Sequence, residues 1–343
     1  MKIGLAYDLK TASDHSPEAP DDAAEELDSP YTIDALAAEM KRLGHEVVYL
    51  GGGPEFLENI RSSAVDFVFN IAEGRGVYRS REAQIPSVLE MLGIAYSGSD
   101  PLTLSLCLDK PQAKRMVQSA GVATPAYFLV SGLQDLDDVG IQTLNFPLVV
   151  KPAFEGSSKG IHQTSRVQRS ADLRQAVETI LSSYHQPALV EEFVAGREVT
   201  VGVLGNNNPQ IIAIMEVVPR NGAGSDFMYT LEVKRDWQRQ VAYRCPPELP
   251  EGWIGQVQQS ALKAFGALQC RDIARIDFRV DTLGRPFFLE ANPLPGLSPA
   301  ISDLCIMAAL SGWTYSQLIE SILRAALERC GMFRCAHAHS SRL

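Results

Sequence analysis

Long apolar runs, regularly spaced cysteines and an excess of positive charge are all missing from this 343-residue chain. No apolar stretch reaches the ~18 residues that a membrane-spanning helix needs, and the amino terminus lacks the apolar core of a signal peptide. The six scattered cysteines are typical of a reducing cytosol. A net charge of −10 lacks the basic footprint of a nucleic-acid-binding protein. We therefore expect a soluble cytoplasmic protein without membrane or nucleic-acid partners.

The composition that is present is that of an ordinary globular protein, with 45% hydrophobic and 21% charged residues. At roughly 100–200 residues per domain, the length predicts two or three domains. An acidic chain can still gather Lys and Arg locally into a pocket for an anionic substrate. The composition is thus compatible with an enzyme that acts on small anionic molecules.

The first 98 residues alternate between patterns typical of strands and of helices, which predicts an α/β domain with a parallel sheet. A long acidic loop is expected at 10–30. The expected strands are 2–7, 46–50 and 65–71, and the expected helices are 31–43 and 83–92.

The remaining residues mix strands and helices less regularly, so an α+β arrangement is expected there. The expected strands are 146–151, 187–194, 198–204, 210–217, 273–280 and 286–291, and the expected helices begin at 109 or span 170–184, 252–266 and 300–329. The tail from 330 is expected to be disordered. Its residues Cys335, His337 and His339 do not follow a standard zinc-ligand spacing.

Two neighbouring strands carry polar residues at alternate positions. Glu290 and Asn292 end one strand, and Arg275 and Asp277 share one face of the other, because side chains at i and i+2 point the same way. Asp277, Glu290 and Asn292 offer the hard oxygen ligands that Mg²⁺ bridging nucleotide phosphates requires. Polar residues at strand ends could instead simply face solvent, but the two pairs in this order favour a metal site.

Two lysines and a Gly/Ser loop indicate a phosphate site. Lys151 ends a very apolar strand, where its charge needs a partner such as a phosphate oxygen. The loop 155–160 lets backbone N–H groups approach phosphate closely, although it is not a Walker A loop. Lys110 opposes the positive end of a helix, so an anion would stabilise it there. Solvated lysines and a plain turn are the alternatives.

These segments, in this order, resemble the ATP-grasp superfamily and, within it, the D-alanine–D-alanine ligases. The match runs from about residue 65 to 328 and includes 90–110, 146–161, 189–205, 274–280 and 288–299. The resemblance implies an ATP-grasp fold with a doubly wound N-terminal substrate domain (1–98). A central domain (99–190) and a C-terminal catalytic domain (191–329) would clasp ATP, followed by the tail 330–343.

The resemblance also implies a role for each site residue. ATP would be held by Lys110, Lys151, Ser158, Glu191, Val194, Glu198 and Lys234, with Glu191 and Val194 at the adenine and Glu198 at the ribose. Two Mg²⁺ ions, or Mn²⁺ in their place, would lie on Asp277, Glu290 and Asn292. Arg275 and the backbone N–H of Gly296 would stabilise a tetrahedral oxyanion, and Ser157 and Glu25 would place the first substrate.

The implied reaction joins a carboxylate to an amine through an acyl phosphate, at the expense of ATP. Because an acyl phosphate hydrolyses in water, a lid must close, and residues 220–237 are expected to form it, with Gly222 and Gly224 as mobile points. The implied substrates are small amino acids or carboxylates, and the implied assembly is a homodimer.

Three departures from the family pattern all touch the amino-acid pockets. Ala23 stands where a serine is usual, Arg235 stands where a tyrosine is usual, and either Ser298 or Ser302 could bind the second substrate's carboxylate. Ligase chemistry on other amino acids, hydroxy acids or amines therefore stays open. A nucleotide-binding protein without turnover is the other alternative, although a degraded site would be expected to have lost one of the residues named above.

Overall fold

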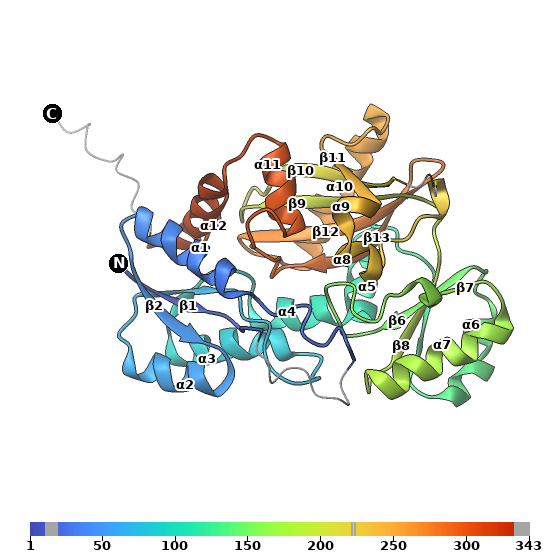
Figure 1. The fold of residues 1–343 in the computed structure, drawn as a ribbon, viewed down its shortest axis with the longest axis horizontal. Coiled ribbons are helices and arrows are strands. Elements are labelled where there is room, and N and C mark those ends of the chain that lie inside the picture. The colour runs from blue at the N-terminus through green and yellow to red at the C-terminus, as the bar shows by residue number, and fades with distance from the viewer. Residues whose placement is uncertain (11–19, 221, 223, 333–343) are drawn as a thin grey trace.

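The computed structural model of the chain describes residues 1–10, 20–220, 222 and 224–332, which form three β-sheets with helices packed around each (Figure 1). Residues 333–343, with Cys335, His337 and His339, and residues 11–19 of the expected acidic loop lie outside this description. None of the helices in the described part of the chain is long and apolar enough to cross a membrane.

The first sheet is parallel throughout, in the order β2-β1-β3-β4, which confirms the predicted α/β start. Its strands are β1 (Lys2–Ala6), β2 (Glu46–Gly51), β3 (Phe67–Asn70) and β4 (Ala95–Tyr96), and its helices are α1 (Pro30–Arg42), α2 (Gly53–Ser62) and α3 (Gln84–Leu92). Alternate side chains of β1 and β3 pack on opposite faces. Ile3 and Phe69 join the cluster around α1, whereas Val68 joins the cluster around α2 and α3.

The second sheet is antiparallel, in the order β11-β10-β9-β12-β13. Its strands are β9 (Gly196–Leu204), β10 (Gln210–Pro219), β11 (Val241–Arg244), β12 (Ile273–Asp281) and β13 (Pro286–Asn292). Helices α4 (Pro101–Leu108), α5 (Lys110–Ser119) and α10 (Glu251–Ala267) pack against one face. On β9 and β12, Val201 and Ile276 point to those helices, so Thr200, Arg275 and Asp277 point to the other face.

The third sheet has the order β5-β8-β6-β7, with α7 (Ser170–Ser183) on one face. Its strands are β5 (Tyr127–Val130), β6 (Leu148–Pro152), β7 (Arg166–Val167) and β8 (Ala188–Glu192), and α6 (Val139–Gln142) joins its edge. Val150 and Val190 point toward α7, which turns Lys151 and Glu191 to the opposite face.

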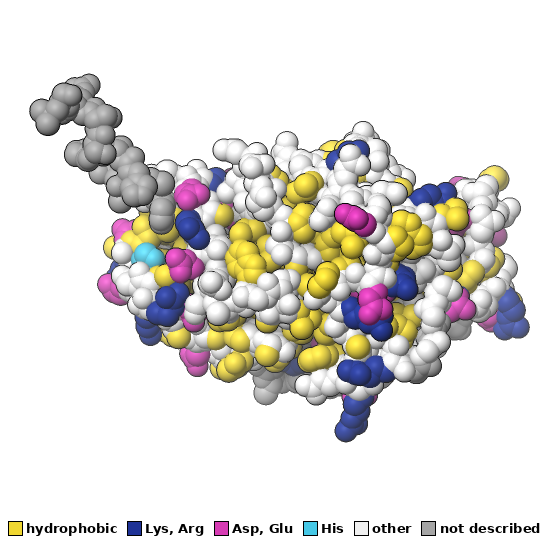
Figure 2. All heavy atoms as spheres, turned by 90° about the horizontal axis from the view of Figure 1, so that it is seen from above, with side chains coloured by type: hydrophobic (Ala, Val, Ile, Leu, Met, Phe, Trp, Pro, Cys, Tyr) yellow, Lys and Arg dark blue, Asp and Glu magenta, His cyan; other side chains and the backbone are white. Residues whose placement is uncertain are grey.

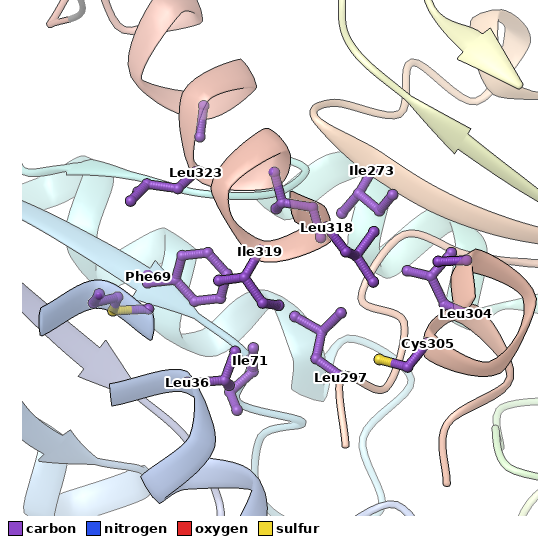
Figure 3. Close-up of a cluster of buried hydrophobic side chains, with 14 of the residues drawn as sticks. Leu36, Phe69, Ile71, Ile273, Leu297, Leu304, Cys305, Leu318, Ile319 and Leu323 are labelled. Carbon is purple, nitrogen blue, oxygen red and sulfur yellow. The ribbon is translucent and has the colours of Figure 1, made fainter. Parts of the chain in front are cut away.

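The expected helical end at 300–329 is two helices, α11 (Asp303–Leu310) and α12 (Tyr315–Arg329). Gly312, with φ +86°, turns the chain between them, and Thr314 caps α12. The predicted helical end is thus divided by a turn, which the continuous apolar pattern of the sequence does not reveal. Helix α12 returns to the first sheet, where Leu318 and Ile319 pack with Leu36 and Phe69 (Figure 3).

The described residues of the proposed lid segment (220–237) include the 3₁₀ turn η5 (Gly224–Asp226), α8 (Leu231–Arg235) and the first residue of α9 (Trp237–Gln240). The short 3₁₀ turns elsewhere are η2 (Arg81–Ala83), η3 (Leu133–Asp137) and η4 (Gln163–Ser165). On the face shown in Figure 2, apolar side chains gather across the middle and Lys and Arg lie interspersed with Asp and Glu, so neither charge sign dominates it.

The three predicted domain boundaries stay a prediction. Helices α4 and α5 follow residue 99 in the chain but pack against β13 of the second sheet. Glu191 and Glu192 are the last residues of β8 and pair with β5 and β6.

Candidate active site

The polar face of β12 and β13 brings the expected metal ligands together. The two strands are antiparallel neighbours, and their register sets Asp277 opposite Glu290 and Arg275 opposite Asn292. The Asp277 carboxylate accepts hydrogen bonds from Thr200 Oγ1 at 2.6 Å, from the Arg275 guanidinium at 2.9 Å and from Asn292 Nδ2 at 3.2 Å. Two carboxylates and an amide on one rigid face are a donor set that fits Mg²⁺.

The two carboxylates have opposite pKa shifts. Burial raises the pKa of Asp277 above its usual value, although Arg275 acts to lower it, and the nearby Glu290 charge adds to the rise. Burial also acts to raise the pKa of Glu290, but Lys110, Lys151 and Arg275 outweigh it and lower the value to about 2. Glu290 is therefore ionised at neutral pH and available as an anionic ligand.

Lys110 connects the metal face to the Gly/Ser loop. Its ammonium group is buried, lies 3.1 Å from Glu290 Oε2 and donates to the backbone carbonyl of Glu155. The loop itself is conformationally unusual, because Ser157 and Ser158 both have positive φ, at 50° and 61°. Such left-handed non-glycine residues cost energy and cluster at functional sites, which agrees with the prediction that this loop approaches a ligand.

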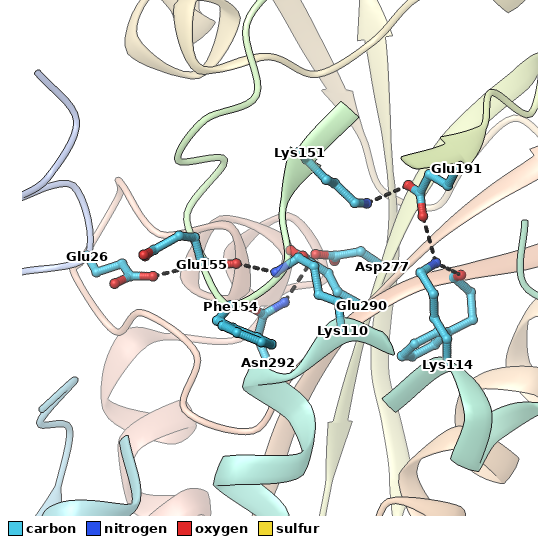
Figure 4. A network of polar contacts seen from close by, with 12 residues as sticks. Glu26, Lys110, Lys114, Lys151, Phe154, Glu155, Glu191, Asp277, Glu290 and Asn292 are labelled. Carbon is cyan, nitrogen blue, oxygen red and sulfur yellow. Dashed lines mark hydrogen bonds and ion pairs between the residues drawn. The ribbon is translucent and has the colours of Figure 1, made fainter. Parts of the chain in front are cut away.

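Lys151 on β6 and Glu191 on the neighbouring strand β8 form an ion pair (Figure 4). Lys151 Nζ lies 2.5 Å from Glu191 Oε1, and Lys114 Nζ lies 2.9 Å from Glu191 Oε2. Burial acts to raise the pKa of Glu191, but the two ammonium groups outweigh it and hold the pKa below its usual value. The Glu191 carboxylate is thus occupied by lysines, and Lys151 reaches the cavity with its remaining hydrogens.

Glu198, the residue expected at the ribose, is held by Arg279 at 3.1 Å. Arg279 also donates to the backbone carbonyls of Val194, Gly196 and Phe227. Arg279 therefore connects Val194, which is expected to lie at the adenine, to Phe227 of the proposed lid segment.

The lid segment contacts the N-terminal part of the chain through Arg235. Its guanidinium donates to Glu25 at 2.9 Å and to Asp21 at 2.8 Å. Lys234 and Tyr229 line the cavities described below, and the Tyr229 hydroxyl lies 2.6 Å from that of Tyr243. The partner of Glu25 is thus Arg235, the residue that stands where the family usually has a tyrosine.

The loop after β13 distinguishes the two candidate serines. Ser302 Oγ accepts a hydrogen bond from Ser298 N at 2.9 Å and lies close beside Gly296. Ser298 Oγ is buried and has no hydrogen-bond partner within the described residues. Both serines and Gly296 line the larger cavity, so both serines remain candidates for contact with a ligand.

Two cavities meet at these residues. The larger has a volume of about 410 Å³ and the smaller about 80 Å³. Residues shared by both are Ser157, Tyr229, Lys234, Arg275, Glu290 and Asp303. Only the smaller cavity is lined by Lys151, Ser158, Glu198 and Asp277, and only the larger by Lys110, Glu25 and Gly296. The expected ATP residues are therefore divided between the two cavities, and Glu191 and Val194 line neither of them.

Sequence reasoning missed a buried charge network beside the Gly/Ser loop. Arg81 donates to Glu26 at 2.7 Å, to Glu155 at 3.1 Å and to the Phe154 carbonyl at 2.8 Å, and Lys159 pairs with both carboxylates. Glu155 and Lys159 are four residues apart and could have been paired from the sequence. Arg279 continues the alternation of Arg275 and Asp277 and could also have been noticed.

Comparison with known proteins gives consistent results. The profile described as the D-ala D-ala ligase C-terminus matches residues 116–324. A D-alanine–D-alanine ligase of Pelotomaculum thermopropionicum is 32% identical over 310 residues, covering 88% of this chain and 93% of that protein. The uncharacterized protein y4sG of Sinorhizobium fredii is 35% identical over 306 residues, covering 86% and 87%. A Bacillus anthracis D-alanine–D-alanine ligase solved with ATP has a TM-score of 0.74 at 23% identity, covering 96% and 98%.

The three sheets and the polar face between them define an enzyme with an ATP-grasp fold, an ATP-dependent ligase that forms C–N bonds. The extent of the profile match and the identity of the relatives place it further: the chain belongs to the D-alanine–D-alanine ligase family. The fold and family predicted from the sequence are thereby confirmed.

Proposed function

We propose that this enzyme activates the carboxylate of one amino acid with ATP as an acyl phosphate and then joins it to the amine of a second. The observation that carries this proposal is the set of Asp277, Glu290 and Asn292 on one face, with Lys110 and Lys151 directed at the same centre. Mg²⁺ bound on that face would neutralise the phosphate oxygens. The division into N-terminal, central and catalytic domains, the homodimer and the cytoplasmic location remain part of this proposal.

The remaining residues fit the two chemical steps. Lys110 and Lys151 would hold the transferred phosphoryl group, since little covalent work is left to the protein beyond positioning and charge neutralisation. Arg275 and the backbone N–H of Gly296 line the same cavity and would stabilise the oxyanion formed when the amine attacks. Expulsion of phosphate then leaves the amide.

D-Alanine is the first substrate to test, because the relatives' names specify it. The amino-acid side of the site nevertheless departs from the family pattern at Ala23 and Arg235. Ser298, whose hydroxyl has no partner among the described residues, would bind the carboxylate of the second substrate. The same chemistry on another pair of amino acids or carboxylates is therefore the alternative within the proposal, and nucleotide binding without turnover is the outcome that would contradict it.

The test is ADP and phosphate release from Mg²⁺-ATP with D- and L-amino acids, singly and in pairs, with products identified by mass. Turnover is expected in the wild type and should fall by at least 100-fold in Glu290→Gln, since a ligand that acts in the transition state is lost. Glu328→Gln, an exposed glutamate on α12, is the matched control. ATP binding with no ADP release in any combination would refute the proposal.

A further inference from the structure

The larger cavity is bordered by three carboxylates that the proposed reaction does not use. Asp28, Glu73 and Glu82 line it and do not line the smaller cavity, so they border the cavity that also contains Glu25 and Gly296. We call these three residues the acidic wall. Glu82 lies in η2, and Glu73 follows β3, so two of the three belong to the N-terminal sheet region.

The acidic wall differs from the other acids of the cavity in its partners. Glu25, Glu26, Glu155, Glu290 and Asp303 each form an ion pair with a lysine or arginine. Within the described residues, Asp28, Glu73 and Glu82 form no ion pair, and neither Glu73 nor Glu82 has a side-chain hydrogen bond there. Glu82 is nevertheless only 8% exposed.

The local backbone holds the wall in place. Gly74 has φ +81°, and a Cβ there would lie 2.0 Å from the carbonyl oxygen of Arg81. Only glycine permits this approach, so the chain between Glu73 and Glu82 folds back on itself and keeps the two carboxylates near each other. The repulsion between them is one cause of the raised pKa of Glu73, after burial.

Three unpaired carboxylates in one cavity cost free energy that a bound cation would recover. Burial, together with the neighbouring Asp8 charge, raises the pKa of Asp28 to about 7. Burial raises that of Glu82 to about 7, with Glu26 adding to the effect and Arg81 opposing it. Arg81 and Lys110 act on Glu82 without forming an ion pair with it, so a cationic side chain in the cavity would give the wall a direct partner.

The wall lies on the side of the first substrate. Arg81, which is adjacent to Glu82 in the chain, donates to the Phe154 carbonyl and to Glu155 and thus ties η2 to the loop that carries Ser157. Ser157 is the residue expected to place the first amino acid. A volume of about 410 Å³ is within the range of ~300–1,000 Å³ typical of sites for small-molecule ligands.

We propose that the acidic wall binds a cationic side chain of the first substrate, so that the preferred first amino acid is basic, with an ammonium or guanidinium group beyond its α-carbon. This inference rests on the proposed ligase function, because it assumes an amino acid in this cavity. It assigns Glu82 and Glu73 as residues that determine specificity.

The experiment measures binding without turnover. Calorimetry with Mg²⁺ and a non-hydrolysable ATP analogue at pH 8 compares ornithine, lysine and arginine, in both stereochemical forms, with norleucine, which has a similar length and no side-chain charge. At least one basic amino acid is expected to bind tenfold or more tightly than norleucine. Glu82→Gln and Glu73→Gln should each reduce this preference at least threefold without weakening norleucine, whereas the exposed Glu58→Gln on α2 should preserve it.

Equal or tighter binding of norleucine, no saturable binding of any basic amino acid, or an unchanged preference in both cavity variants would overturn the inference. ADP release measured on the same samples separates it from the proposed function. Preference for a basic amino acid without ADP release under any condition would leave the binding inference standing and refute the ligase proposal. ADP release with neutral amino acids, together with equal binding of basic and neutral amino acids, would support the ligase proposal and refute the binding inference.

Discussion

Replacing Arg81 with methionine should destabilise the protein far more than removal of an exposed arginine. Arg81 is 4% exposed and holds two buried carboxylates, Glu26 and Glu155, that lie 55 and 74 residues away in the chain. Burial acts to raise the pKa of Glu26, but Arg81 and then Lys159 outweigh it and lower the value from 4.5 to about 2.

The size of the effect follows from this shift. A difference of about 2.5 pKa units at Glu26 corresponds to about 3 kcal/mol of stability at neutral pH. Breaking a buried ion pair from one side typically costs about 3–5 kcal/mol, which agrees. Because the folded-state pKa of Glu26 is depressed, the stabilisation is fully present above pH 4.5 and is lost as the pH falls from 4.5 toward 2.

The assay is urea-induced unfolding of the wild type and Arg81→Met at pH 7 and at pH 3.5. A loss of about 3 kcal/mol in the free energy of unfolding is expected at pH 7, with a smaller loss at pH 3.5. Arg169→Met is the matched control, because Arg169 forms an exposed pair with Asp172 on α7 and should give no measurable change. A loss below about 1 kcal/mol at pH 7, or one that does not depend on pH, would refute the reasoning.

Two further predictions concern the lid and the acidic wall. Arg235→Ala removes the ion pairs that join α8 to Glu25 and Asp21, so the lid should close less completely. The expected results are a higher KM for the first substrate and more ATP hydrolysis without ligation, because water then reaches the acyl phosphate. The ratio of ADP to amide product measures this, and an unchanged ratio would contradict the prediction. Glu82→Gln should raise the free energy of unfolding by up to about 3 kcal/mol above pH 7 and by little below pH 4.5. The reason is that the folded-state pKa of about 7 lies above the ordinary 4.5, so the charged carboxylate destabilises the folded state as the pH rises. Urea unfolding at pH 4.5 and pH 8 measures the change, and an equal gain in stability at both pH values would count against the prediction.

The shared face of the expected metal ligands could be predicted from local spacing alone. Alternation of two residues places Arg275 and Asp277 on one face of β12, and the same alternation places Glu290 and Asn292 on one face of β13. The helix starts at Pro30 and Lys110 also agree with the predicted positions, since capping residues act within one turn. These features depend on neighbours in the chain and therefore could be seen in the sequence.

Tertiary structure decided which charges pair. Lys151, expected to face phosphate alone, also pairs with Glu191, and Lys114 joins them although nothing in its helical segment indicates a role. Such contacts join residues 40–77 positions apart. Ion pairs act over a few ångströms in space whatever their separation in the chain, so periodicity carries no information about them.

The sequence by itself determined the parallel character of the first sheet, the shared face of the expected metal ligands and the family, because each follows from short-range spacing or from the order of motifs. Only the tertiary structure decided that Arg81 joins Glu26 to Glu155 and that Asp28, Glu73 and Glu82 border one cavity. It also decided that the Ser298 hydroxyl is buried without a partner in the part of the chain that the structure describes. The physical reason is that burial and charge pairing depend on which distant segments pack together, and that packing is set by the whole core rather than by any one segment.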